Sequence, residues 1–146
     1  MLISSPGFGV IDSGCGRTLI GQATLGQVFH LLKEKGKRVP TLKKSQNLFR
    51  FGNGQEELSE KTATIPVGIH GQDGHIEAAV IQGDAPLLLS RSAMKSLGAS
   101  LDFEHETLTL KGRESRPVQV NSAGQFIVNV MDFSESNEVL STDHYM

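Results

Sequence analysis

Residues 8–16 read FGVIDSGCG, and this stretch decides both the fold and the candidate site. The apolar run before Asp12 predicts a short buried strand, and the glycines after it predict a tight bend. A carboxylate at the end of such a strand is the first candidate functional group of the chain. The alternative is structural, because an Asp-Ser-Gly sequence commonly sets its carboxylate on backbone N–H groups of its own turn.

The segments that follow predict two helices among several strands. Apolar residues recur at helical spacing over residues 24–35, where Thr24 and Gln27 have the form of a capping box. Ser90 is placed to cap a second helix that Gly98 closes. Strands are predicted at residues 8–12, 48–51, 62–69, 75–81, 86–89, 100–103, 107–110, 117–120 and 125–131.

Two hairpins are expected among these strands. Asn53-Gly54 suits the positive φ angles of a tight turn after residues 48–51. Residues 71–74 carry a glycine at each end and predict the turn of the second hairpin. The order of the elements therefore predicts an all-β fold with one or two short helices.

Composition narrows the classes of function. A length of 146 residues with 38% hydrophobic residues predicts one domain over residues 1–133, with a flexible tail at residues 134–146. Intermixed charges with a net charge of -2 predict no nucleic-acid or membrane partner, which leaves peptides or proteins. Cys15 is the only cysteine and no apolar run is long enough to span a membrane, so an intracellular, cytoplasmic protein is expected.

The stretch GVIDSGC at residues 9–15 resembles the active-site motif of aspartic proteases, in which apolar residues precede Asp, Ser or Thr, and Gly. Retroviral-type members continue through a short loop to Ser or Thr and then aliphatic residues, and here Thr18 begins that group. A glycine-containing hairpin follows where the family has its flap, the hairpin that closes over substrate. The sequence PLLLSR at residues 86–91 then matches a strand-to-helix junction, with Ser90 where family members usually have Gly. Residues 8–133 are similar, in this order, to protease segments of retrotransposon polyproteins.

The resemblance implies a retropepsin-like acid-protease half-barrel whose active site lies at a homodimer interface. It implies an aspartic endopeptidase that cleaves extended peptides, with polyprotein processing as its role and with no metal or cofactor. The implied catalytic residues are Asp12, Ser13 and Gly14. The implied substrate-binding residues are Cys15, Gly16, Arg17, Phe51, Gly52, Asn53, Gly54 and Leu88.

The chemistry explains the need for a dimer. Two facing carboxylates that share one proton supply both the base that deprotonates water and the acid that protonates the peptide carbonyl. This chain has one such motif, at Asp12, so the second carboxylate must come from a symmetry mate. Members of the family usually have a strand ahead of the motif, and few residues precede Asp12 here. Residues 125–133 are then the candidate interface, as a long strand that would otherwise be an open edge.

Other interpretations of these residues are weaker. Cys15 could be a nucleophile paired with a distant histidine, but a lone cysteine after a buried strand is more often a small core residue. His70 and His75 lack the neighbouring ligands that a metal site needs. The main alternative is a catalytically weak or inactive dimerisation or peptide-binding module, consistent with Ser90 and Cys15.

Overall fold

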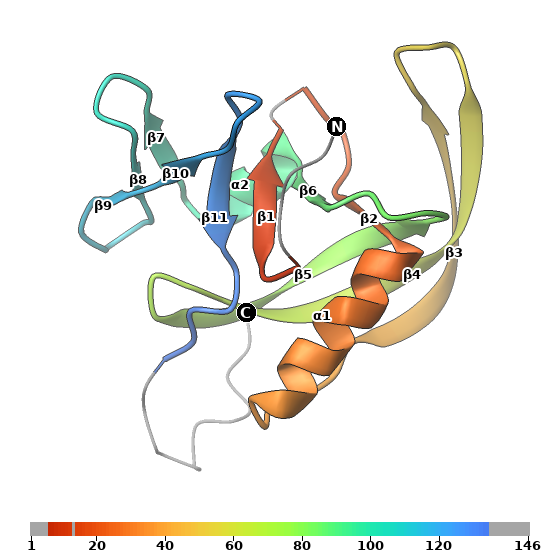
Figure 1. Ribbon diagram of the computed structural model, residues 1–146, viewed down its shortest axis with the longest axis horizontal. Coiled ribbons are helices and arrows are strands. Elements are labelled where there is room, and N and C mark those ends of the chain that lie inside the picture. The colour runs from red at the N-terminus through yellow and green to blue at the C-terminus, as the bar shows by residue number, and fades with distance from the viewer. Residues whose placement is uncertain (1–5, 13, 135–146) are drawn as a thin grey trace.

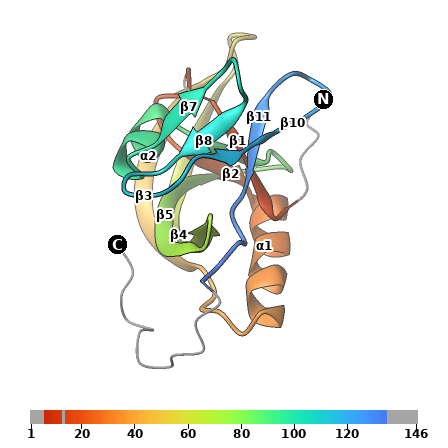
Figure 2. The same ribbon diagram turned by 90° about the vertical axis from the view of Figure 1, so that its left-hand side faces the viewer.

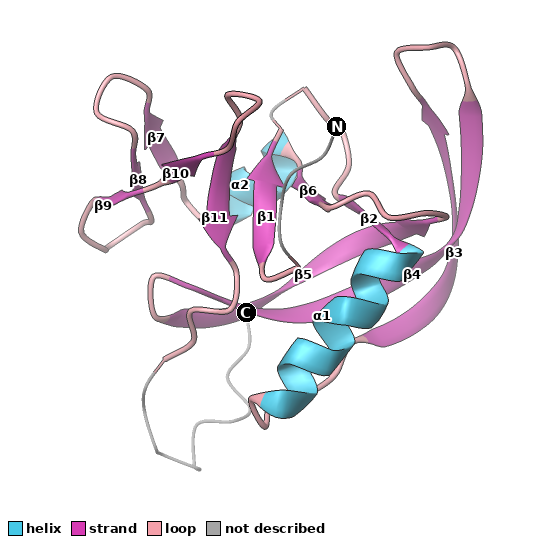
Figure 3. Cartoon of the chain, in the orientation of Figure 1, coloured by secondary structure: helices cyan, strands magenta, loops and turns pink. Residues whose placement is uncertain are grey.

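Eleven strands and two helices make up the computed structural model, which describes residues 6–12 and 14–134 (Figure 1). The chain is mostly β, as predicted, with two short helices (Figure 3). The helices are α1 (Gln22–Glu34) and α2 (Arg91–Ser96). The strands are β1 (Phe8–Ile11), β2 (Leu19–Gly21), β3 (Thr41–Arg50), β4 (Glu56–Ile69), β5 (Gln72–Ile81), β6 (Leu87–Leu89), β7 (Ser100–Asp102), β8 (Thr107–Thr109), β9 (Arg116–Pro117), β10 (Gln119–Val120) and β11 (Phe126–Asn129).

An eight-stranded mixed sheet runs in the order β10-β11-β1-β6-β2-β5-β4-β3. Strand β6 lies between β1 and β2, parallel to β1 and antiparallel to β2. The chain between β1 and β2 therefore passes across the end of β6. This crossing places the residues after Ile11 at the edge where β1 and β6 both end, because Ile11 is paired with Leu89.

The middle of the chain forms two long hairpins, β3–β4 and β4–β5, which share strand β4. β4 runs unbroken through residues 56–69, pairing with β3 on one side and β5 on the other. The turn predicted at residues 71–74 is wrong: the turn lies at His70 and Gly71, whose φ angles are 53° and 77°. β5 already begins at Gln72, and Gly74 is paired with Val67 inside the sheet. Gly71 was a correct turn signal, but the second glycine, Gly74, lies inside β5 and drew the predicted turn too far along the chain.

Tertiary contacts, not a capping box, start α1. The helix begins at Gln22, and its N-cap Gly21 makes no side-chain cap hydrogen bond. The N–H of Ala23 donates to the carbonyl of Gly83 (2.9 Å), and the buried Thr24 hydroxyl donates to the carbonyl of Asp84 (3.1 Å). A Cβ on Gly21 would lie 2.5 Å from the backbone nitrogen of Ala85, so this close approach requires glycine. The capping-box prediction is therefore wrong, because the loop over residues 83–85 takes the groups that a cap would have paired.

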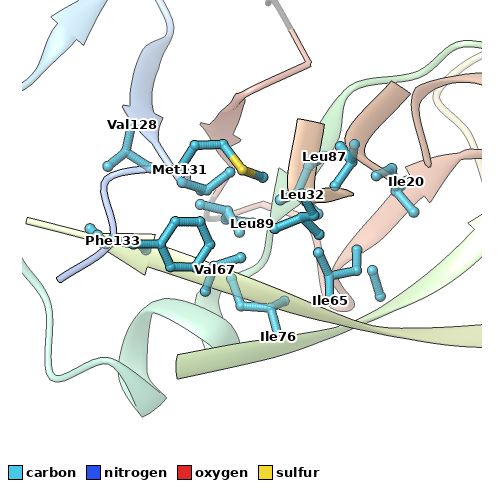
Figure 4. Close-up of a cluster of buried hydrophobic side chains, with 14 of the residues drawn as sticks. Ile20, Leu32, Ile65, Val67, Ile76, Leu87, Leu89, Val128, Met131 and Phe133 are labelled. Atoms are coloured by element: carbon cyan, nitrogen blue, oxygen red, sulfur yellow. The ribbon is translucent and has the colours of Figure 1, made fainter. Parts of the chain in front are cut away.

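The core lies between α1, the large sheet and the segment after β11 (Figure 4). Helix α1 contributes Leu25, Val28 and Leu32. Other members of this core are Ile20, Ile65, Val67, Ile76, Leu87, Leu89, Val128, Met131 and Phe133. The chain around Phe133 packs so close to β4 that a Cβ on Gly68 would lie 2.5 Å from the Cα of Phe133.

A second sheet of three strands, in the order β7-β8-β9, stands beside β10 and β11 (Figure 2). Leu108 and Leu110 of this region are buried in the same core, and the ring of Phe103 meets that of Phe126 at 5.4 Å. The small sheet thus packs on the large one as part of one structure. Residue 134, the first of the predicted tail, donates its N–H to the Asp73 carboxylate (2.6 Å). The rest of the predicted tail lies outside the described residues.

β11 is not the open edge that the alternation suggested. It pairs with β1 on one side and with β10 on the other. The edges of the large sheet are β10 and β3. The argument that placed an interface at residues 125–133 is therefore wrong, because this strand already fills the flank of β1.

Candidate active site

Asp12 lies directly after β1, at the point where the chain leaves the sheet. Its N–H donates to the carbonyl of Leu89 at 3.0 Å, which extends the β1–β6 pairing by one residue. Because β1 is held between β6 and β11, the position of Asp12 is fixed by strands on both sides. Asp12 is half-buried, so the carboxylate is held by the sheet and still reaches solvent.

The bend after Asp12 closes on the carboxylate itself. The N–H of Gly14 donates to Asp12 Oδ1 at 3.1 Å, and the N–H of Cys15 donates to the Asp12 carbonyl at 3.0 Å. Gly14 thus brings a backbone N–H to the carboxylate. Ser13, the other predicted member of this group, lies outside the described residues.

Thr18 and Ser90 hold the far end of the loop. Their exposed fractions are only 5% and 2%, and the Thr18 hydroxyl donates to Ser90 Oγ at 2.9 Å. The N–H of Ser90 donates to Thr18 Oγ1 (3.1 Å), while Ser90 Oγ accepts from the N–H of Ala93 (3.2 Å) and so caps α2. A glycine at residue 90 could not make the side-chain bonds. The departure from the family pattern is therefore accommodated by a buried hydroxyl pair.

A cavity of about 640 Å³, here called the Asp12 cavity, joins the loop to the β3–β4 hairpin. Its lining residues are Asp12, Gly14, Cys15, Gly16, Arg17, Leu19, Leu48, Phe49, Arg50, Phe51, Gly52 and Leu88. The cavity brings together segments that are far apart in the sequence. It gives Asp12 an open space with apolar and cationic walls.

Most of the predicted substrate-binding residues line this cavity. Those that do are Cys15, Gly16, Arg17, Phe51, Gly52 and Leu88. Asn53 and Gly54 are not among the lining residues; they build the hairpin turn, where Asn53 Oδ1 accepts from the N–H of Gln55 (2.9 Å).

Sequence reasoning missed Leu19, Leu48, Phe49 and Arg50 as lining residues. Leu48 and Arg50 lie in the strand that was predicted to lead into the hairpin, and that was the one available signal.

Cys15 is half-buried at the cavity wall. Its thiol donates to the carbonyl of Arg17 at 2.7 Å, which tightens the loop. No histidine is among the lining residues of the Asp12 cavity in the described part of the chain, so a Cys–His pair finds no geometric support here. The thiol closes the loop without filling a fully buried space.

The charges around the Asp12 cavity are mainly positive. Arg17 and Arg50 line it, and Asp12 is the only carboxylate among its described lining residues. Arg50 is engaged by Glu56, with its Nε 2.6 Å from Glu56 Oε2. Arg17 also lines a neighbouring cavity of about 610 Å³ between β5 and α2.

The titratable groups with shifted pKa values lie away from this cavity. Burial and the nearby Arg116 guanidinium lower the pKa of His70, and the Asp132 carboxylate partly opposes them. A hydrogen bond from His105 lowers the pKa of the exposed Asp102.

The described residues hold neither a cluster of metal ligands nor a membrane-spanning helix. Residues 6–12 and 14–134 contain no group of three His, Cys, Asp or Glu side chains placed to hold a metal ion. Neither α1 nor α2 is long and apolar enough to cross a bilayer.

Comparisons with known proteins add no assignment. Neither a scan against protein-family models nor a search of curated proteins gives a match for this chain.

Proposed function

We propose that this chain is a retropepsin-like aspartic protease domain that cleaves extended peptides, as in polyprotein processing, when two copies join their Asp12 carboxylates. One observation carries the proposal. Asp12, fixed at the end of a central strand, shares a cavity with the long β3–β4 hairpin of the same chain. A carboxylate beneath a hairpin that can cover an extended peptide is the arrangement this chemistry needs.

The proposed reaction needs no group beyond the two carboxylates and water. One Asp12 is ionised and takes a proton from water, whose oxygen attacks the peptide carbonyl carbon. The protonated Asp12 of the other copy donates its proton to the carbonyl oxygen, which gives a neutral tetrahedral diol. The Asp12 that took the proton from water then gives it to the peptide nitrogen, and the other Asp12 takes a proton from one hydroxyl of the diol. The C–N bond breaks, which releases an amine and a carboxylic acid and restores the dyad with its one proton. Two carboxylates that face each other in a dimer share one proton, because two adjacent negative charges repel.

The other residues of the cavity have supporting roles in this proposal. The N–H of Gly14 donates to Asp12 Oδ1 and so helps to orient the carboxylate in the cavity. The apolar side chains of Leu48, Phe51 and Leu88 offer surfaces for substrate side chains. The hairpin turn, with Phe51 N–H donating to the Gln55 carbonyl (2.8 Å), is the element that would close over the peptide.

A binding module is the second candidate, and one observation favours it. The Gly14 N–H on Asp12 Oδ1 is also the bond that an ordinary Asp-Ser-Gly turn makes. In that case the chain would form dimers and bind peptides without cleaving them.

Digestion of a proteome-derived peptide mixture separates the two candidates. Wild type and Asp12→Asn are incubated at pH about 5, where a shared-proton dyad should work, and the products are read by mass spectrometry. New termini from wild type alone support the protease. Absence of cleavage by wild-type protein that sedimentation shows to be dimeric would reject the protease in favour of the module.

A further inference from the structure

We propose that Arg17 makes the site selective for peptides with an acidic side chain beside the cleaved bond. This inference rests on the proposed proteolytic function and names its substrate class. An aspartic protease site with purely apolar walls would favour apolar side chains only. The charges in the Asp12 cavity point to a mixed preference.

Arg17 lies in the loop that carries Asp12, on the wall of the same cavity. It is exposed, and its guanidinium makes no hydrogen bond or ion pair with residues 6–12 or 14–134. Among the described residues, the hydrogen bond to Arg17 is at its backbone, where its carbonyl accepts from the Cys15 thiol. The side chain is therefore not needed to hold the loop and is available to a ligand.

Two other charged side chains near Arg17, Arg50 and Glu77, already have ion-pair partners. Arg50, the second cation of the cavity, is paired with Glu56 at 2.6 Å. Glu77, which lines the neighbouring cavity together with Arg17, is paired with Lys43 at 3.4 Å. Arg17 is thus the charge in this region that a substrate would have to neutralise.

The unpaired Arg17 guanidinium would determine which substrate side chain binds best beside it. A peptide laid along the cavity removes water from the guanidinium, and a neutral side chain offers nothing in exchange. A carboxylate restores the lost interaction, and Arg presents a planar fork of donors that matches it. The apolar neighbours Leu19 and Leu88 meanwhile favour aliphatic or aromatic groups at adjacent positions.

A symmetric dimer would carry this feature twice. A two-fold axis through the paired Asp12 residues places one Arg17 on each side of the bound peptide. Acidic residues are then expected at equivalent positions before and after the cleaved bond. An asymmetric preference would contradict this geometry.

Cleavage profiles of charge variants test the inference. Wild type, Arg17→Glu and Arg17→Lys digest the same peptide mixture, and Arg113→Glu serves as control because Arg113 is exposed, lines neither cavity and carries the same charge. We expect wild type to cut sites flanked by Glu or Asp about fivefold better than their Gln or Asn counterparts. Arg17→Glu should reverse the preference toward Lys and Arg, Arg17→Lys should retain part of it, and Arg113→Glu should leave it unchanged. Raising the salt concentration should weaken the preference.

The outcomes separate this inference from the function on which it rests. Asp12-dependent cleavage with no acidic preference, or with one that survives Arg17→Glu, would overturn the inference and leave the protease standing. If neither wild type nor any variant cleaves the peptides, the proposed proteolytic function is rejected. Binding of a fluorescent peptide with a Leu-Phe centre flanked by glutamates, against its glutamine twin, to Asp12→Asn protein then decides about Arg17. Equal affinity of the two peptides would overturn the inference.

Discussion

At the scale of single residues, the buried pair of Thr18 and Ser90 ties the start of β2 to the end of β6. The hydroxyl oxygen of each residue has hydrogen-bond partners inside the protein. The sequence predicted Ser90 as a helix cap, and the structure confirms that Ser90 caps α2. The hydrogen bond between Ser90 and Thr18 could not be predicted, because the two residues meet only when β6 pairs with β2.

Removing the Ser90 hydroxyl should lower the stability of the fold. We expect Ser90→Ala to lower the free energy of unfolding by about 1–2 kcal/mol, since α2 loses its cap and the buried Thr18 hydroxyl loses an acceptor. Urea denaturation measures the change. Ser92→Ala, at an exposed position of the same helix, is the matched control and should change stability by less than about 0.5 kcal/mol. Equal effects of the two substitutions would show that the Thr18–Ser90 bonds contribute nothing.

His70 predicts a loss of stability in acid. Its pKa is lowered in the folded chain, so the unfolded chain binds a proton first as the pH falls below about 6.5. The contribution of neutral His70 is therefore present above that pH and is lost as the pH falls through the folded pKa. His70→Asn tolerates the positive φ and cannot titrate, so its unfolding free energy should decline less between pH 7 and about 5. His75→Asn, at an exposed position, should follow wild type; if both variants behave alike, His70 is not the sensor.

At the scale of elements, the β3–β4 hairpin connects the fold to the site. Asn53-Gly54 marked its turn in the sequence, and the structure has a turn there with φ of 86° at Gly54. Asn53 does not have the positive φ that the prediction gave it, and the connection between β3 and β4 spans residues 51–55. β4 is longer than predicted, since the mostly polar residues 56–61 lay outside the predicted strands but pair with β3. Polar and charged residues can occupy a strand whose side chains are exposed, so composition alone hid this segment.

The two glycines of this turn should behave differently. Gly54→Ala forces a side chain into a positive φ and should destabilise the turn by about 1 kcal/mol, whereas Gly52→Ala has open space and no such constraint. Hydrogen exchange at the Gly54 amide, which donates to the Phe51 carbonyl (2.8 Å), should accelerate in the first variant only. If the hairpin is the proposed flap, peptide cleavage by Gly54→Ala should also fall severalfold. Similar exchange in both variants would argue against a strained turn.

At the scale of the whole molecule, the mostly β architecture was predictable and the strand neighbours were not. Periodicity and turn residues locate strands one at a time, but pairing joins residues distant in the chain, as with Gly9 and Val128. The same limit applied to the site. Asp12 and its loop were evident from one motif, whereas Leu48 and Arg50 line the cavity only because the folded chain brings β3 to the Asp12 loop. The resemblance to retropepsins concerned the order of the segments along the chain and did not predict which strands pair.

A shared active site predicts inhibition by an inactive copy. If each functional unit needs two Asp12 residues, adding an equal amount of Asp12→Asn chain should lower wild-type activity to about half, because mixed dimers form at random and do not cleave. The proteins are mixed dilute, concentrated together and assayed on one peptide. An equal amount of Arg113→Glu chain, whose Asp12 is intact, should raise total activity instead. Wild-type activity that is indifferent to Asp12→Asn under exchange would show that one chain acts alone.

The position of β1 also governs when the site can exist during synthesis. The strand that carries Asp12 is made early, yet its two neighbours are residues 87–89 and 126–129. Contacts between residues so far apart in the chain form slowly and only after the later segments have left the ribosome. A nascent chain that has exposed the Asp12 motif therefore still lacks the sheet that positions it. If the chain is the proposed protease and lies within a longer polyprotein, this delay would keep a newly made copy from cutting its own chain until β11 has been synthesised and has paired.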